Sequence, residues 1–170
     1  KATTYKDERG WFVDGRFSFK ALPAGVHEFQ SVEYWIYEMP TSPVPQVLML
    51  GGRDVPGDLP EAIEGIPVGM QADALFFLHT ARIDRPMSER ERETGAQIEL
   101  CKYVVHYADG ERVEVPVYLG IDVDSWLQAS APRALPGAQL AWTQAYPDGG
   151  HHAALYAMHW NNPRPEGGIE

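Results

Sequence analysis

Residues Tyr103–Leu119 read YVVHYADGERVEVPVYL, the clearest structural pattern in the chain. Two runs of alternating apolar and polar residues flank the dipeptide Asp109-Gly110. Alternation with a period of two is typical of a strand with one buried face, and Asp-Gly between two such runs predicts a β-hairpin. A two-residue loop at this point predicts a type I′ turn, in which both central residues adopt positive φ.

The type I′ turn also predicts which residues oppose each other. Tyr107 pairs with Arg112 and His106 with Val113, and directly opposed residues share a face. One face then carries Leu100, Val104, His106, Val113, Val115 and Val117, and the other carries Tyr103, Val105, Tyr107, Arg112, Glu114 and Pro116. We expect the first face to be the core side, with His106 buried as a neutral imidazole bonded to the backbone. The second face is either a covered or solvated outer face or a surface for sugar stacking.

Similar short segments, rich in β-branched and aromatic residues, recur along the chain between 16 glycines and 14 prolines. This spacing predicts an all-β sandwich or barrel. The expected strands are Arg16–Phe19, His27–Glu28, Tyr34–Ile36, Gln46–Leu50, Ile66–Val68, Ala74–His79, Gln97–Tyr107, Arg112–Leu119, Leu140–Ala145 and Ala153–Trp160. A charged loop or frayed turn is expected at Pro86–Glu93, and a short helical turn at Asp124–Ala129.

Length and charge restrict the class of protein. A chain of 170 residues fits one domain, residues 1–170. Its net charge of −10 repels phosphate backbones and anionic lipids, so we expect no nucleic-acid and no membrane partner. The chain starts at Lys1 without a signal-like segment and ends within a strand pattern at Ile169-Glu170. We therefore expect a domain excised from a longer multidomain protein.

Motifs of well-known catalytic sites are missing from the sequence. It contains no glycine-rich phosphate loop, no HExxH, no CxxC and no nucleophile elbow. Asp122 and Asp124 alternate onto one side of the segment GIDVDSW, and such hard oxygen ligands suit Ca²⁺. The alternative for this pair is a solvated turn, and we expect no cofactor to be required.

Five tryptophans supply the candidates for a ligand site. Trp35 and Trp160 lie in apolar strand patterns and are expected in the core. Trp126, Trp142 and Tyr146 stand next to turn residues, where they either pack at the rim or stack on a ligand held by end loops. In the second case Asp124, Gln144 and Asp148 would hydrogen-bond sugar hydroxyls. A competing ligand surface is the sheet face with Tyr103 and Tyr107.

Four stretches of the chain carry a resemblance to a known family. They are GWFVDGRFSFKALPAGVHEFQSVEYWI (10–36), IPVGMQADALFFLHTA (66–81), YVVHYADGERVEVPVYLGIDVDSW (103–126) and LYAMHWNNPRPEGGIE (155–170). In this order they resemble the galactose-binding-like β-sandwich domains, of carbohydrate-binding-module type, attached to secreted bacterial glycoside hydrolases and polysaccharide lyases. The charged insertion Ile83–Gln97 departs from that pattern and could reshape a rim loop.

The resemblance implies an antiparallel β-sandwich of jelly-roll type that acts as a non-catalytic carbohydrate-binding or accessory module. Its partners would be a polysaccharide or oligosaccharide and a covalently linked catalytic domain. Its location would be secreted, periplasmic or at the cell surface, and a structural Ca²⁺ is common among such folds. Two alternatives stay open: a catalytic glycoside hydrolase or lyase domain with an unrecognised His/Tyr/Glu site, and a structural spacer without a ligand.

Overall fold

The protein is an all-β chain with antiparallel sheets. The computed structural model describes residues 17, 19, 21–29, 31–37, 47–52, 59–83, 89, 93–95 and 97–170. Among them, helix is confined to residues 89, 93 and 94. The strands are β1 Gly25–Phe29, β2 Val32–Ile36, β3 Ala74–His79, β4 Glu99–His106, β5 Arg112–Tyr118, β6 Leu127–Gln128, β7 Ala138–Ala145 and β8 His152–Asn161.

The long strand β8 organises the largest sheet. Strand β7 pairs antiparallel with it over Ala138–Ala145, while β3 and β6 pair antiparallel with it at its two ends. The segment from Ala153 to Met158 is buried throughout, because this central strand is covered on both faces. A strand covered on both faces is expected to be apolar along its length rather than alternating, as ALYAM is here.

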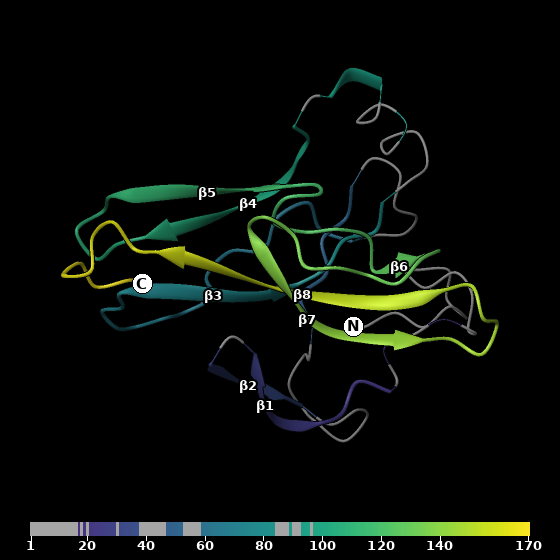
Figure 1. Ribbon diagram of the computed structural model, residues 1–170. Coiled ribbons are helices and arrows are strands. Elements are labelled where there is room, and N and C mark those ends of the chain that lie inside the picture. Colours follow the sequence, from purple (N-terminus) through teal and green to yellow (C-terminus); the bar gives the residue numbers. More distant parts are fainter. Residues whose placement is uncertain are drawn as a thin grey trace.

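Strands β4 and β5 form a hairpin that packs over one face of the β8 sheet, so that the two make the layers of a sandwich (Figure 1). The core between them contains Val105, Tyr107, Val115 and Val117 from the hairpin. The β8 sheet contributes Ala138, Ala154, Tyr156 and Met158. The segment after β8 closes the sandwich, because Ile169 forms antiparallel bridges with both Met70 and Tyr107.

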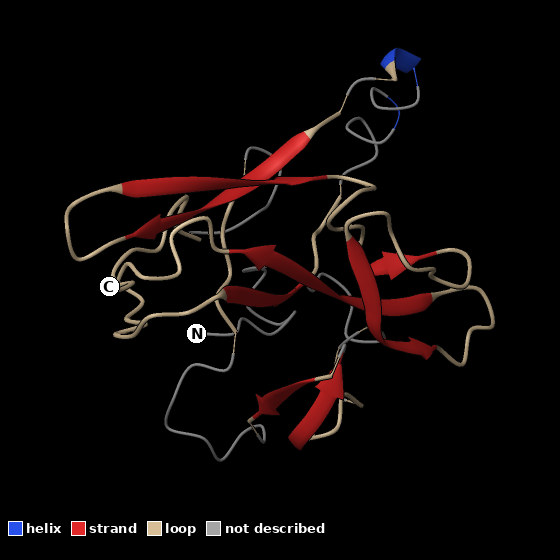
Figure 2. Ribbon diagram, turned by 60° about the vertical axis from the view of Figure 1, so that its left-hand side comes forward, coloured by secondary structure: helices blue, strands red, loops and turns tan. Residues whose placement is uncertain are grey.

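The β1–β2 hairpin lies on the other side of the β8 sheet, as both views show (Figure 1, Figure 2). Its strands alternate between half-buried and exposed residues along their whole length. Among the described residues, none of the buried core side chains comes from β1 or β2. This hairpin therefore adds little to the central core.

The register of the β4–β5 hairpin differs from the expected one by a single residue. His106 opposes Arg112 and Val105 opposes Val113, so Val105 and Tyr107 face the core and His106 is exposed. The prediction of a buried His106 was wrong. The cause is the turn: Asp109 is not among the residues with positive φ, whereas Gly110 has φ +88°. The loop is consequently a three-residue connection with glycine at its left-handed position, closed by a bond from the Tyr107 N–H to the Glu111 oxygen (2.9 Å).

Several other expectations can be compared with the structure. Ala74–His79 is confirmed as β3, and the strands expected within residues 97–119 and 140–160 are confirmed with small shifts of their ends. No strand forms at Val47–Leu50 or Ile66–Val68, and the segment Asp124–Ala129 contains the short strand β6, Leu127–Gln128, instead of a helical turn. Gln46, Arg16 and Ser18 lie outside the described residues, as do most residues of Pro86–Glu93. Trp160 packs against the core, but Trp35 is 65% exposed, so its expected burial was wrong.

The register makes a sharp mutational prediction, because neighbouring residues of β4 point to opposite faces. Val105→Ala should lower the free energy of unfolding by about 2 kcal/mol, since it removes buried methyl groups from the core. His106→Ala should change it by less than about 0.5 kcal/mol, as is usual for an exposed side chain. Urea titrations followed by tryptophan fluorescence measure both. A larger loss of stability from His106→Ala than from Val105→Ala would contradict the observed register and support that of a type I′ turn.

Candidate functional site

Trp126 and Trp142 come together around Phe19. Their ring centroids lie 5.8 Å and 5.9 Å from the Phe19 ring. Trp126 is buried, and its backbone bonds to Ala81 and Ala154, which fixes it between β3 and β8. Trp142 is half-buried and opposes Leu155 on the side of the β8 sheet away from the β4–β5 hairpin. The two indoles therefore pack within the fold and do not form one open platform.

Tyr146 and Asp148 belong to a second small cluster at the β7–β8 turn. Tyr146 is buried, and its ring lies 5.0 Å from Phe17, which lies equally close to His151. The Asp148 carboxylate accepts the Gly150 and His151 N–H groups and pairs with the His151 Nδ1 at 2.6 Å. The His151 contact holds the pKa of Asp148 below its usual value. Asp148 thus stabilises its own turn.

Gln144 lies on the same side of the β8 sheet as Trp142, opposite Ala153. Its Oε1 is buried and has no hydrogen-bond partner among the described residues. A buried carbonyl oxygen without a donor costs free energy, so this atom could accept a bond from a water molecule or a ligand. Gln144 is the one predicted site residue with an unused polar atom inside the fold.

Asp124 lies at a different place, in a pocket of about 400 Å³ beside β6 and the loop of residues 130–135. The lining combines a carboxylate, an amide, a hydroxyl and a guanidinium with small apolar groups: Asp124, Gln128, Ser130, Ala131, Arg133, Ala134, Leu135 and Tyr156. The amide of Gln128 is fixed, because its Nε2 donates to the Tyr156 hydroxyl (2.7 Å) and the Ser125 oxygen (3.0 Å). Tyr156 is fully buried and forms the floor, and burial raises its pKa.

Asp122 stabilises the loop between β5 and β6. Its Oδ2 accepts the Tyr118 N–H at 2.9 Å, and its Oδ1 lies where a side chain on Gly137 would begin, 2.2 Å from the Cβ position. Asp124 Oδ1 accepts the Ser125 N–H at 2.6 Å. Ca²⁺ takes six to eight oxygen ligands. Two carboxylates already bonded to backbone are a poor fit to that number, and the described part of the chain contains no group of three His, Cys, Asp or Glu that could hold a metal ion. A calcium ion at this pair stays a prediction.

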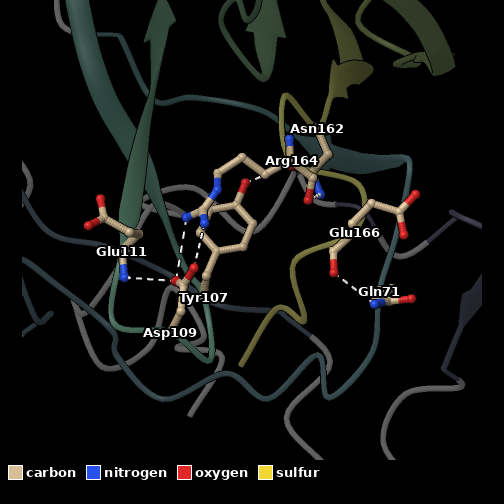
Figure 3. Close-up of polar contacts among 7 residues, drawn as sticks. All are labelled: Gln71, Tyr107, Asp109, Glu111, Asn162, Arg164 and Glu166. Carbon is tan, nitrogen blue, oxygen red and sulfur yellow. Dashed lines mark hydrogen bonds and ion pairs between the residues drawn. The ribbon is translucent and has the colours of Figure 1, made fainter.

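A polar network that the sequence did not single out joins the β4–β5 hairpin to the segment after β8 (Figure 3). Tyr107, 1% exposed, donates its hydroxyl to Asn162 Oδ1 at 2.6 Å. Asn162 Nδ2 donates to the Ala72 and Arg164 oxygens. Arg164 lies 4.6 Å above the Tyr107 ring and pairs with Asp109. Because these groups bind one another, the network stabilises the fold and offers no free group for catalysis.

His79 and Tyr103 form a further polar pair, in which both side chains are half-buried. The Asp122 carbonyl can only accept, so His79 Nε2 donates to it (2.9 Å) and Nδ1 accepts the Tyr103 hydroxyl (3.0 Å). Burial lowers the pKa of His79 and raises that of Tyr103. The Tyr103 ring also stacks on Phe77 at 3.8 Å. A neutral histidine with both nitrogens bonded is a structural group. The sheet face with Tyr103 and Tyr107 is the inner face of the hairpin, so it presents no open surface to a sugar.

Comparisons with protein-family models, with curated proteins and with solved structures found no match to this chain. In the described ranges no helix is long and apolar enough to cross a membrane. The pocket beside Asp124 brings several polar side chains together among the described residues. Arg133, its cation, was missed in the sequence because a lone arginine in a loop carries no motif.

The Tyr107–Asn162 bond can be tested by removing one oxygen. Tyr107→Phe should lower the free energy of unfolding by about 1–2 kcal/mol, because Asn162 then loses a donor in a buried place. The matched control is Tyr118→Phe, since the Tyr118 hydroxyl bonds to none of the described residues. Thermal and urea unfolding measure both variants. Equal effects would contradict a stabilising role of the bond.

The half-buried His79 makes stability depend on pH. Its folded pKa is lowered, so below about pH 6.5 the unfolded chain binds more protons than the folded one. The contribution of neutral His79 to the free energy of unfolding is therefore complete above that pH, and it is lost as the pH falls toward the folded pKa. His79→Gln, which can keep both hydrogen bonds without titrating, should lose less stability than the wild type between about pH 8 and pH 5. Urea unfolding midpoints of the wild type and of His79→Gln across this pH range test the prediction. Equal changes of the two midpoints with pH would contradict it.

Proposed function

We propose that this protein is a non-catalytic carbohydrate-binding module of jelly-roll, galactose-binding-like type, linked to a secreted polysaccharide-degrading enzyme. The observation that carries the proposal is the polar pocket beside Asp124, held by the end loops of an all-β, sandwich-like frame. Loops fixed by packed sheets are a common place for binding, because the sheets hold them rigidly. The secreted location and the linked catalytic domain follow from the family resemblance alone.

The pocket suits a hydroxyl-rich ligand. Asp124 offers a carboxylate acceptor, Ser130 a hydroxyl that both donates and accepts, and Arg133 a fork of N–H donors. Ala131, Ala134 and Leu135 supply apolar patches against which the C–H groups of a sugar can pack. A volume of about 400 Å³ lies within the usual range for small-molecule sites. One or two sugar units are the natural occupant.

The described titratable groups with shifted pKa values are bonded to partners within the fold. A glycosidase needs one carboxylic acid whose pKa is raised so that it stays protonated. The described carboxyl groups with shifted pKa values, Asp109, Glu114 and Asp148, are all lowered by bonds to Arg164, Lys102 and His151. His79 is held neutral between two partners. These described groups therefore have structural roles in the fold.

Charge and site size set expectations for the ligand. A net charge of −10 disfavours polyanionic glycans, because long-range repulsion slows their approach. A pocket for one or two sugars buries little area and must overcome the entropy of association, so the affinity should be modest. A structural Ca²⁺, where bound, would add stability through preferential binding to the folded state.

Affinity electrophoresis on a panel of neutral polysaccharides tests the proposal. At least one polysaccharide should retard the protein without release of product, and Arg133→Ala should weaken its retention about tenfold by removing charged donors. Arg112→Ala is the matched control, because it removes the same charge from an exposed site on β5, outside the pocket. Asp124→Asn keeps the Oδ1 bond to Ser125 while removing the negative charge. Absence of retardation by every glycan, or equal effects of the two arginine changes, would refute the proposal.

A further inference from the structure

The outer face of the β1–β2 hairpin exposes large apolar side chains and two directly opposed glutamates to solvent. Val26 opposes Trp35, and Glu28 opposes Glu33, so these four side chains share one face. The face is exposed, and Tyr37 continues it beyond the end of β2. We call Val26, Glu28, Glu33, Trp35 and Tyr37 the hairpin face. The half-buried inner face contains Phe29 and Tyr34, whose rings contact each other.

The aromatic half of the hairpin face is open to solvent. Trp35 is 65% exposed, Val26 50% and Tyr37 46%. The Trp35 and Tyr37 ring centroids lie 6.4 Å apart with their planes tilted by 48°. A cluster of exposed apolar side chains usually marks a binding surface, because folding gains nothing from leaving it in water. Two tilted rings present faces at an angle, which suits a single flexible chain better than a flat crystalline surface.

The charged half of the hairpin face supplies an independent signal. Glu28 and Glu33 are directly opposed in an antiparallel pair, where like charges destabilise the sheet. Within the described ranges no lysine, arginine or histidine side chain forms an ion pair with either of them. A bound cation or cationic group would remove this repulsion. The pair therefore favours a ligand that brings positive charge.

We infer that the hairpin face binds a glycan that carries protonated amino groups, that is, a polysaccharide of amino sugars. The pyranose rings lie against Trp35 and Tyr37, while the ammonium groups pair with Glu28 and Glu33. The net charge of −10 favours the approach of such a polycation. The inference rests on the proposed function as a glycan-binding module and adds a second surface with a defined ligand class.

The test compares chitosan oligosaccharides, which carry ammonium groups, with their fully N-acetylated counterparts in calorimetric titrations at acidic pH. The full chain should bind the amino form about tenfold more tightly, and raised salt should reduce this preference. The double variant Glu28→Gln/Glu33→Gln should lose the preference, and Trp35→Ala should weaken both ligands about tenfold. Glu61→Gln/Glu64→Gln is the matched control for charge, because both glutamates are exposed and lie outside the hairpin face.

The possible results separate this inference from the proposed function. Retained binding of the amino form by Trp35→Ala and by the double glutamine variant, with circular dichroism showing folded proteins, overturns the inference. If neutral glycans still bind and depend on Arg133, the proposed function stands without it. If no glycan of either kind binds, both fail. Light scattering that shows a dimer abolished by Trp35→Ala would assign the face to self-association and also overturn the inference.

Discussion

The hydrogen bond from Tyr107 to Asn162 connects the end of β4 to the end of β8, 55 positions further along the chain. Tyr107 follows β4, Asn162 follows β8, and the Asn162 amide also bonds to the carbonyl of Ala72 just before β3. A buried asparagine is tolerated only where its polar atoms find partners, and here Oδ1 accepts twice while Nδ2 donates twice. The bond thus joins the β4–β5 layer to the segments that flank the β8 sheet, beside the apolar core that the two layers share.

This network also explains how far local sequence reasoning could reach. The alternating runs around Asp109-Gly110 were sufficient to predict two strands and a hairpin, and they did so correctly. They could not choose between a two-residue and a three-residue loop, because both place Gly110 at positive φ. Asp109 bonds to the Glu111 N–H and pairs with Arg164, 55 positions away, which favours the three-residue turn. A one-residue change of register moves every side chain of one strand to the other face, and so His106 and Val105 exchanged places.

The candidate site shows the same limit at the level of side chains. Leu140 packs toward the core, and an unbroken strand would place Trp142 on the same face two residues later. The register shifts between these residues, and the bulge turns Trp142 to the opposite face, against Phe19. The aromatic residues beside turns therefore stay a prediction as ligand contacts, and their exposure depends on a bulge and on contacts with Phe17 and Phe19. For Trp35 the error runs the other way. A tryptophan in an apolar strand pattern predicts a core residue, and only the position of the β1–β2 hairpin outside the core shows that Trp35 is exposed.

The pocket beside Asp124 and the hairpin face differ in how strongly they are coupled to the stability of the fold. The pocket beside Asp124 has a floor, Tyr156, that belongs to the buried core, so changes there act on stability as well as binding. The hairpin face contributes no buried core side chain among the described residues. Core packing therefore does not restrict which residues occupy it, and a ligand can do so instead. Freedom from packing explains how an exposed tryptophan is tolerated, but it does not explain Glu28 opposite Glu33, which any neutral pair would improve. A repulsive pair that packing does not require is best understood as a binding feature, since its cost is removed when a cationic ligand lies between the two carboxylates.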